Sequence, residues 1–135
     1  MNSDEIQAEF KRGNESLAAA TLLADAALFN DAMSRAYYAV LHYVRSLLFT
    51  EDIVPQSHHG AFVHFSKHFV KTGRMSQDCN RILGRLQKLR EEADYMTGAK
   101  FCAEDIASVL ESVREFQART LELLVKQGIV CEQTR

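Results

Sequence analysis

Apolar residues recur along most of the chain at intervals of three, four or seven positions, the spacing of one face of an α-helix. In the first segment, residues 3–27, they form a single stripe that includes Ile6, Phe10, Leu17, Ala20 and Ala24. Ser3 is expected to cap this helix and Asn30 to cap the next, because such side chains accept hydrogen bonds from free backbone N–H groups. The pattern therefore predicts an amphipathic helix that a short polar connection joins to a second helix.

The second predicted helix, residues 31–49, is apolar on more than one side and should be the most buried helix. It ends before Pro55, because proline disfavours helical geometry in the residue that precedes it. Its aromatic pair, Tyr37 and Tyr38, is expected in the core or at an interface. Arg35 and His42 are its few polar interior residues, and burying them has a cost unless they are paired.

The rest of the chain predicts one shorter and two long helices. The shorter one begins after a Ser57 cap and runs to about Val70, with Gly73 placed to end it in a left-handed conformation. Ser76 should cap the next helix, and Gly128 should end the last one. No stretch alternates in the manner of a strand. We therefore predict an all-α, up-down antiparallel bundle of four long helices and one shorter helix in a single domain, residues 1–128, with a frayed tail at residues 129–135.

Composition narrows the class of protein. A chain of 135 residues with 47% apolar and 25% charged side chains can bury a core without disulfides. Its first ten residues do not resemble a secretory signal, and its least polar stretches are too short for a membrane span. Its three cysteines form no Cys-x-x-Cys pair. These features predict a cytoplasmic protein with reduced thiols and no contact with a membrane.

Charge is distributed unevenly: residues 67–100 carry a net charge of +4, whereas the chain as a whole carries −2. Part of this excess lies on the outward face of the fourth predicted helix, at Arg81, Arg85 and Lys88. This basic strip is either a solvated face or a contact for RNA or a nucleotide phosphate. Tyr95, near the end of that helix, is free to reach a ligand.

Arg35 and His42 form the strongest candidate for chemistry. Seven positions are close to two helical turns, which places the two side chains on one face, about 10 Å apart along the axis. Such a pair suits RNA cleavage without a metal, in which a histidine moves a proton and a guanidinium stabilises charge on the phosphate. The structural alternative is a buried arginine held by a carboxylate, with Asp94 as its partner, and a core histidine.

The chain offers little for a metal or a cofactor. His64 and His68 stand four apart, a spacing that can bind zinc when a third ligand is near, but the sequence supplies none convincingly. It also contains no glycine-rich loop that could cradle a phosphate. We therefore expect neither a metal site nor a cofactor.

Several segments together resemble one family, the HEPN domain proteins of prokaryotes. They are the runs Ser34–Leu48, Ser57-His58-His59-Gly60, His68–Gly73 and Leu89–Tyr95. The resemblance implies a helical bundle that is usually a homodimer and is often encoded beside a minimal nucleotidyltransferase, with which it acts as a toxin–antitoxin pair. Many members are metal-independent ribonucleases with an Arg-x(4–6)-His motif. Arg35 and His42 match that motif at its longest spacing.

Two hypotheses follow from the residues and the resemblance together. In the first, the protein cleaves RNA at a groove between two copies: Arg35 binds phosphate, His42 transfers the proton, and Asp94 orients or neutralises Arg35. In the second, the same surface belongs to a non-catalytic subunit that binds a nucleotide or acts as a scaffold for a nucleotidyltransferase. Ala36 favours the second, because the residue after the arginine is commonly polar in the ribonucleases.

Overall fold

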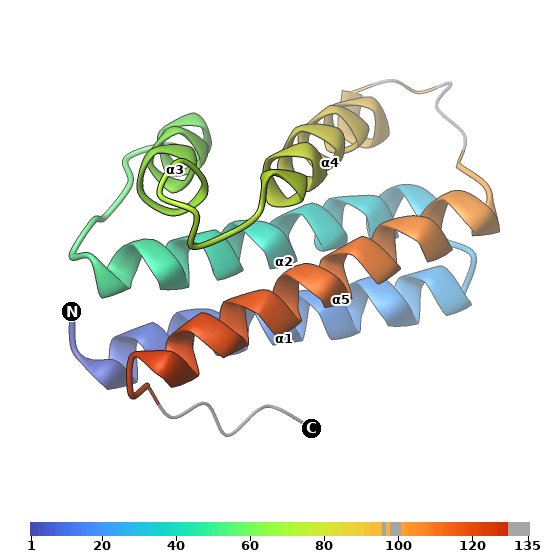
Figure 1. Ribbon diagram of the computed structural model, residues 1–135. Coiled ribbons are helices and arrows are strands. Elements are labelled where there is room, and N and C mark those ends of the chain that lie inside the picture. Colours follow the sequence, from blue (N-terminus) through green and yellow to red (C-terminus); the bar gives the residue numbers. More distant parts are fainter. Residues whose placement is uncertain (96, 98–100, 130–135) are drawn as a thin grey trace.

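The computed structural model describes residues 1–95, 97 and 101–129, and this part of the chain contains helices and no strand. Over these residues the predicted all-α bundle is confirmed, and Figure 1 shows how its helices pack together. Within the described residues, no helix is both long and apolar enough to cross a membrane. The helices are α1 (Ser3–Asp25), α2 (Phe29–Thr50), α3 (His58–Phe65), α4 (Gln77–Tyr95) and α5 (Ala103–Lys126), with a π-helical segment η1 (Ser66–Val70) directly after α3.

Helix α2 is the centre of the bundle. It packs against α1 and α5 on one side and against α3 and α4 on the other (Figure 1). More than half of its residues are buried, on all sides except one narrow face. The expectation that this helix is the most buried is therefore confirmed, and its remaining polar face is where chemistry can occur.

The packing of α1 against α2 depends on a close approach at Gly13. A Cβ atom added at Gly13 would lie only 2.4 Å from Cε1 of Tyr43 on α2. The Tyr43 ring is fully buried, lies 5.2 Å from the Phe10 ring, and donates a hydrogen bond from its hydroxyl to Asn14 Oδ1 at 2.7 Å. This contact brings the polar residues of α1 beside those of α2.

Two predicted caps are wrong. Asn2 caps α1 instead of Ser3, its Oδ1 accepting from the Glu5 N–H at 2.9 Å. Helix α2 begins at Phe29, one residue before the predicted cap Asn30, and no side chain caps its start. Asn30 instead directs its amide toward the carbonyl oxygen of Ala93 on α4, at 3.5 Å.

Other predicted ends are confirmed. Ser57 Oγ accepts from the Gly60 N–H at 2.9 Å, and Gly73 and Gly128 both have φ +80°. Helix α4 begins directly after Ser76, where its start was predicted, whereas capping by the Ser76 side chain stays a prediction. The predicted third helix does reach Val70, but its last five residues form the wider π turns of η1. Most of the predicted loop at 97–101 and of the predicted tail, positions 98–100 and 130–135, lie outside the described residues.

Candidate functional site

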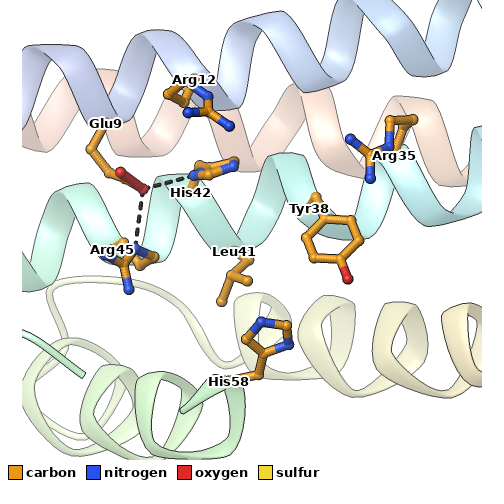
Figure 2. A pocket seen from close by; sticks show the side chains of 8 residues that line it. All are labelled: Glu9, Arg12, Arg35, Tyr38, Leu41, His42, Arg45 and His58. Carbon is orange, nitrogen blue, oxygen red and sulfur yellow. Dashed lines mark hydrogen bonds and ion pairs between the residues drawn. The ribbon is translucent and has the colours of Figure 1, made fainter. Parts of the chain in front are cut away.

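A groove of about 520 Å³ runs along the polar face of α2 (Figure 2). Each of its α2 residues lies three or four positions from another one, so they share one face of the helix. Helix α1 forms one wall, and the first turn of α3 contributes His58. The prediction that Arg35 and His42 lie on one face of this helix is confirmed. The groove is lined by Glu9, Arg12, Arg35, Tyr38, Leu41, His42, Arg45 and His58.

His42 is held by a carboxylate from the neighbouring helix. Its Nδ1 lies 2.7 Å from Oε2 of Glu9, and Nε of Arg45 donates to the same oxygen at 3.2 Å (Figure 2). The Glu9 side chain is 14% exposed and the His42 side chain 18% exposed. The second ring nitrogen of His42, Nε2, has no hydrogen-bond partner among the described residues. His42 is therefore fixed at one nitrogen and available at the other.

The environment of Glu9 keeps it ionised. Burial would raise the pKa of its carboxyl, but the hydrogen bonds from His42 and Arg45 and the electrostatic interaction with both side chains outweigh burial and lower the pKa below its ordinary value. Glu9 is thus an acceptor of hydrogen bonds throughout the neutral range.

Arg35 is exposed, and its guanidinium carbon lies 4.8 Å above the ring of Tyr38. In the part of the chain that the structure describes, no carboxylate forms an ion pair with it. It is therefore not the buried, carboxylate-held arginine of the structural alternative. Tyr38 is only half-buried and lines the groove, unlike the fully buried Tyr37. Arg35 and Tyr38 together offer a cation and an aromatic surface to a ligand.

Asp94 takes a different partner from the one expected. It forms an ion pair with Arg90, at 3.4 Å from Nη1 to Oδ2, and accepts a hydrogen bond from Ser34 Oγ. With Arg35, Ser34 and Tyr38, it also lines a second hollow of about 460 Å³. A role for Asp94 in neutralising Arg35 through space stays a prediction.

Arg90 was not singled out by the sequence, although it lies inside one of the segments that carry the resemblance. Its guanidinium carbon lies 4.8 Å from the ring centre of Tyr37 on α2 and 5.9 Å from that of Tyr95. Of these contacts, only the one with Tyr37 joins α4 to α2, because Tyr95 and Asp94 belong to α4 itself. Arg90 therefore packs on α2 and also pairs with Asp94, which lines the second hollow.

The basic strip lies apart from the groove. Arg81 pairs with Asp78 on its own helix, and Nη1 of Arg85 donates to Ser108 Oγ on α5 at 3.4 Å. Lys88 is exposed, and neither it nor the two arginines line the groove. Tyr95 is 73% exposed and does not line it either. Contact between these four residues and RNA stays a prediction.

Helix α1 and the end of α2 supply groove residues that sequence reasoning missed: Glu9, Arg12 and Arg45. The sequence does indicate Arg45, because it lies three positions after His42 and so on the same face of α2. Nothing in the sequence indicates Glu9 and Arg12 as groove residues, since only the packing of α1 on α2 brings them to the groove. Arg12, like Arg35, forms no ion pair with any residue that the structure describes.

His58 adds an uncharged ring to the groove. Burial, together with the nearby positive charges of Arg90 and Arg45, lowers its pKa below the ordinary value for histidine. Its Nδ1 lies 3.1 Å from the hydroxyl oxygen of Tyr37. The lasting positive charge of the groove therefore comes from its three arginines.

His64 and His68, the histidine pair considered as a zinc site, stack on each other. Their ring centroids lie 5.9 Å apart. Over the described ranges, no group of three or more His, Cys, Asp or Glu side chains is placed to hold a metal ion. The structure thus supplies no third ligand near this pair.

Comparisons with known proteins agree on one family. The model of the HEPN domain matches residues 6–123, which include the whole groove. The protein named "Putative toxin MJ0605" of Methanocaldococcus jannaschii is 35% identical over 121 residues, which are 90% of each chain. UPF0332 protein glr0978 of Gloeobacter violaceus is 35% identical over 99 residues, 73% of this chain and 79% of that protein. The chain belongs to the HEPN domain family.

Proposed function

We propose that this HEPN protein is a metal-independent endoribonuclease that acts as the toxin of a toxin–antitoxin module. One observation carries the proposal: the groove holds His42 by a carboxylate at one nitrogen and leaves the other nitrogen free, beside Arg12 and Arg35, which form no ion pair with any described carboxylate. A fixed histidine can move a proton, and free guanidiniums bind phosphate through paired hydrogen bonds.

The reaction that fits this groove is attack of an RNA 2′-hydroxyl on the adjacent phosphorus. Nε2 of His42 removes the hydroxyl proton as the new P–O bond forms, and the bond to the 5′-oxygen breaks. Arg35 stabilises the charge that develops on the phosphate oxygens. The products are a 2′,3′-cyclic phosphate and a 5′-hydroxyl.

The leaving 5′-oxygen needs a proton, and one groove has a single histidine held in this way. We propose that a second copy of the chain supplies it: in a symmetric homodimer, two such grooves face one RNA strand, and one His42 is the base while the other is the acid. In the cell, a minimal nucleotidyltransferase is the proposed antitoxin partner. Relatives named as toxins support the module.

The alternative function, a non-catalytic nucleotide-binding or scaffold subunit, rests on Ala36. Ala36 is 0% exposed and does not line the groove. A polar side chain at that position would have to enter the core. Because Glu9 already supplies a polar partner to His42 from α1, the groove does not depend on residue 36, and we favour the ribonuclease.

The test compares Arg35→Ala with Arg119→Ala on RNA in the presence of EDTA. Arg119 is the matched control, because it is an exposed arginine on α5 that neither lines the groove nor belongs to the basic strip. We expect the wild type to cleave RNA and Arg35→Ala to lower kcat/KM about 10- to 100-fold, the effect of losing a charged hydrogen bond of about 1.5–3 kcal/mol. Arg119→Ala should stay within about twofold of the wild type.

Two results would contradict the proposal: no cleavage by the wild type in EDTA, or equal losses in the two variants. RNA or nucleotide binding that depends on Arg35 without any cleavage would favour the non-catalytic alternative. Identification of a 2′,3′-cyclic phosphate end would separate this reaction from hydrolysis by a contaminating metal-dependent nuclease.

A further inference from the structure

A single carboxylate oxygen links the two helices that form the groove. Oε2 of Glu9, on α1, accepts from both His42 and Arg45 of α2. We propose that Glu9 is the positioning residue of the site: it fixes the neutral His42 ring in the tautomer that carries its proton on Nδ1. The effect on cleavage rests on the proposed function, whereas the tautomer can be measured in the protein alone.

The hydrogen bond itself dictates this tautomer. A carboxylate can only accept hydrogen bonds, so the Nδ1 that lies 2.7 Å from it has to be the donor. Neutral imidazole has one protonated and one unprotonated nitrogen, and Nε2 is therefore the one with the free electron pair. That nitrogen has no partner among the described residues and can take a proton from a ligand in the groove.

Arg45 holds the carboxylate in place. Its Nε donates to the same oxygen, and its guanidinium carbon lies 5.2 Å from the ring centre of Phe49. Behind Glu9, the neighbouring Phe10 is buried against Tyr43. Glu9 thus has little freedom to turn away from His42, and such restraint is what a positioning residue requires.

A merely structural ion pair between α1 and α2 would be satisfied by Arg45 alone. The shorter contact, 2.7 Å against 3.2 Å, goes to His42 instead. This places a carboxylate that is only 14% exposed beside the His42 ring, in the groove that Arg35 also lines. In this arrangement a carboxylate binds Nδ1 of the histidine and so orients the ring, with Nε2 left for a ligand.

The charged and titratable groups around Glu9 and His42 come from three helices. They are Arg12 on α1, Arg35 and Arg45 on α2, and His58 on α3. Because the pKa of Glu9 is lowered, the bond to His42 stabilises the fold above the unfolded-state pKa of a glutamate and is lost as pH falls through the lower folded-state pKa. Glu9 therefore keeps its orienting charge through the neutral range.

The decisive experiment is ¹⁵N NMR of protein labelled at histidine, with the His42 signals identified by their loss in His42→Gln. In the wild type, neutral His42 should be the Nδ1–H tautomer. In Glu9→Ala, which removes the acceptor, it should change toward the Nε2–H tautomer that free histidine prefers in water. Glu15→Ala, an exposed glutamate on the same helix, is the control and should change nothing.

Cleavage kinetics provide a second measurement. Glu9→Gln keeps the side-chain shape but can either donate to or accept from Nδ1, so it should lower kcat about 10- to 100-fold with KM within about twofold. An Nε2–H tautomer in the wild type, or an unchanged tautomer in Glu9→Ala, would overturn the inference. If the tautomer behaves as expected but the wild type cleaves no RNA, the positioning role of Glu9 stands and the proposed function fails.

Discussion

Replacing His42 by alanine is expected to lower kcat for RNA cleavage by about 10²- to 10⁴-fold, because it removes the group that we propose moves the proton. Binding of RNA should weaken far less, since Arg12, Arg35 and Arg45 still line the groove. The measurement is single-turnover cleavage in EDTA, together with the affinity for an RNA whose 2′-hydroxyl is methylated and which cannot react.

His59→Ala is the matched control, because His59 is an exposed histidine that does not line the groove. It should keep the wild-type rate. Imidazole added to the buffer should restore part of the rate to His42→Ala and none to Arg35→Ala, because it replaces only the missing base. A His42→Ala variant that cleaves at more than half the wild-type rate would show that the histidine is not the proton carrier.

The helices of this fold were predictable because apolar periodicity reports which face is buried, whatever that face packs against. Helix ends were harder. The chain leaves α1 and α2 through Ala27 and Asp52, both with positive φ, at 61° and 57°. Left-handed residues are usually expected at glycine, so nothing at these positions indicates a helix end. The predicted start of α2 was one of the boundaries affected.

The site residues likewise fall into two groups, those that helical spacing predicts and those that only the packing of helices brings together. The α2 face was predictable, because Arg35 and His42 are brought together by helical spacing alone. Glu9 and Arg12 were not, since their position depends on how α1 is rotated against α2. The partner of Asp94 is a similar case: Arg90 lies four residues earlier on the same helix and forms the ion pair, whereas Arg35 belongs to another helix. The sequence therefore identifies His42, whereas tertiary packing determines which charged side chains surround it.

That packing can be tested at Gly13, where alanine is expected to destabilise the protein by about 2 kcal/mol. In an ordinary helix interior, this change would gain roughly 0.5–1 kcal/mol. Here the new Cβ atom would lie 2.4 Å from Cε1 and 2.6 Å from Cδ1 of Tyr43. The ring cannot easily retreat, because it is fully buried and its hydroxyl is bonded to Asn14. Overpacking of this kind costs about 1–3 kcal/mol or more, which exceeds the helical gain.

Gly84 supplies the matched control in α4, where nothing lies within 4 Å of an added Cβ atom. Gly84→Ala should raise the free energy of unfolding by about 0.5–1 kcal/mol, whereas Gly13→Ala should lower Tm by roughly 6–10 °C. Equal effects in the two variants would mean that α1 and α2 do not approach each other so closely at Gly13.

The close approach also has a consequence for the site. The clash at Gly13 forces α1 away from α2, and Glu9 moves with α1. Gly13→Ala should then also lower the rate of RNA cleavage below the melting range, which would link the packing of the two helices to the positioning of His42.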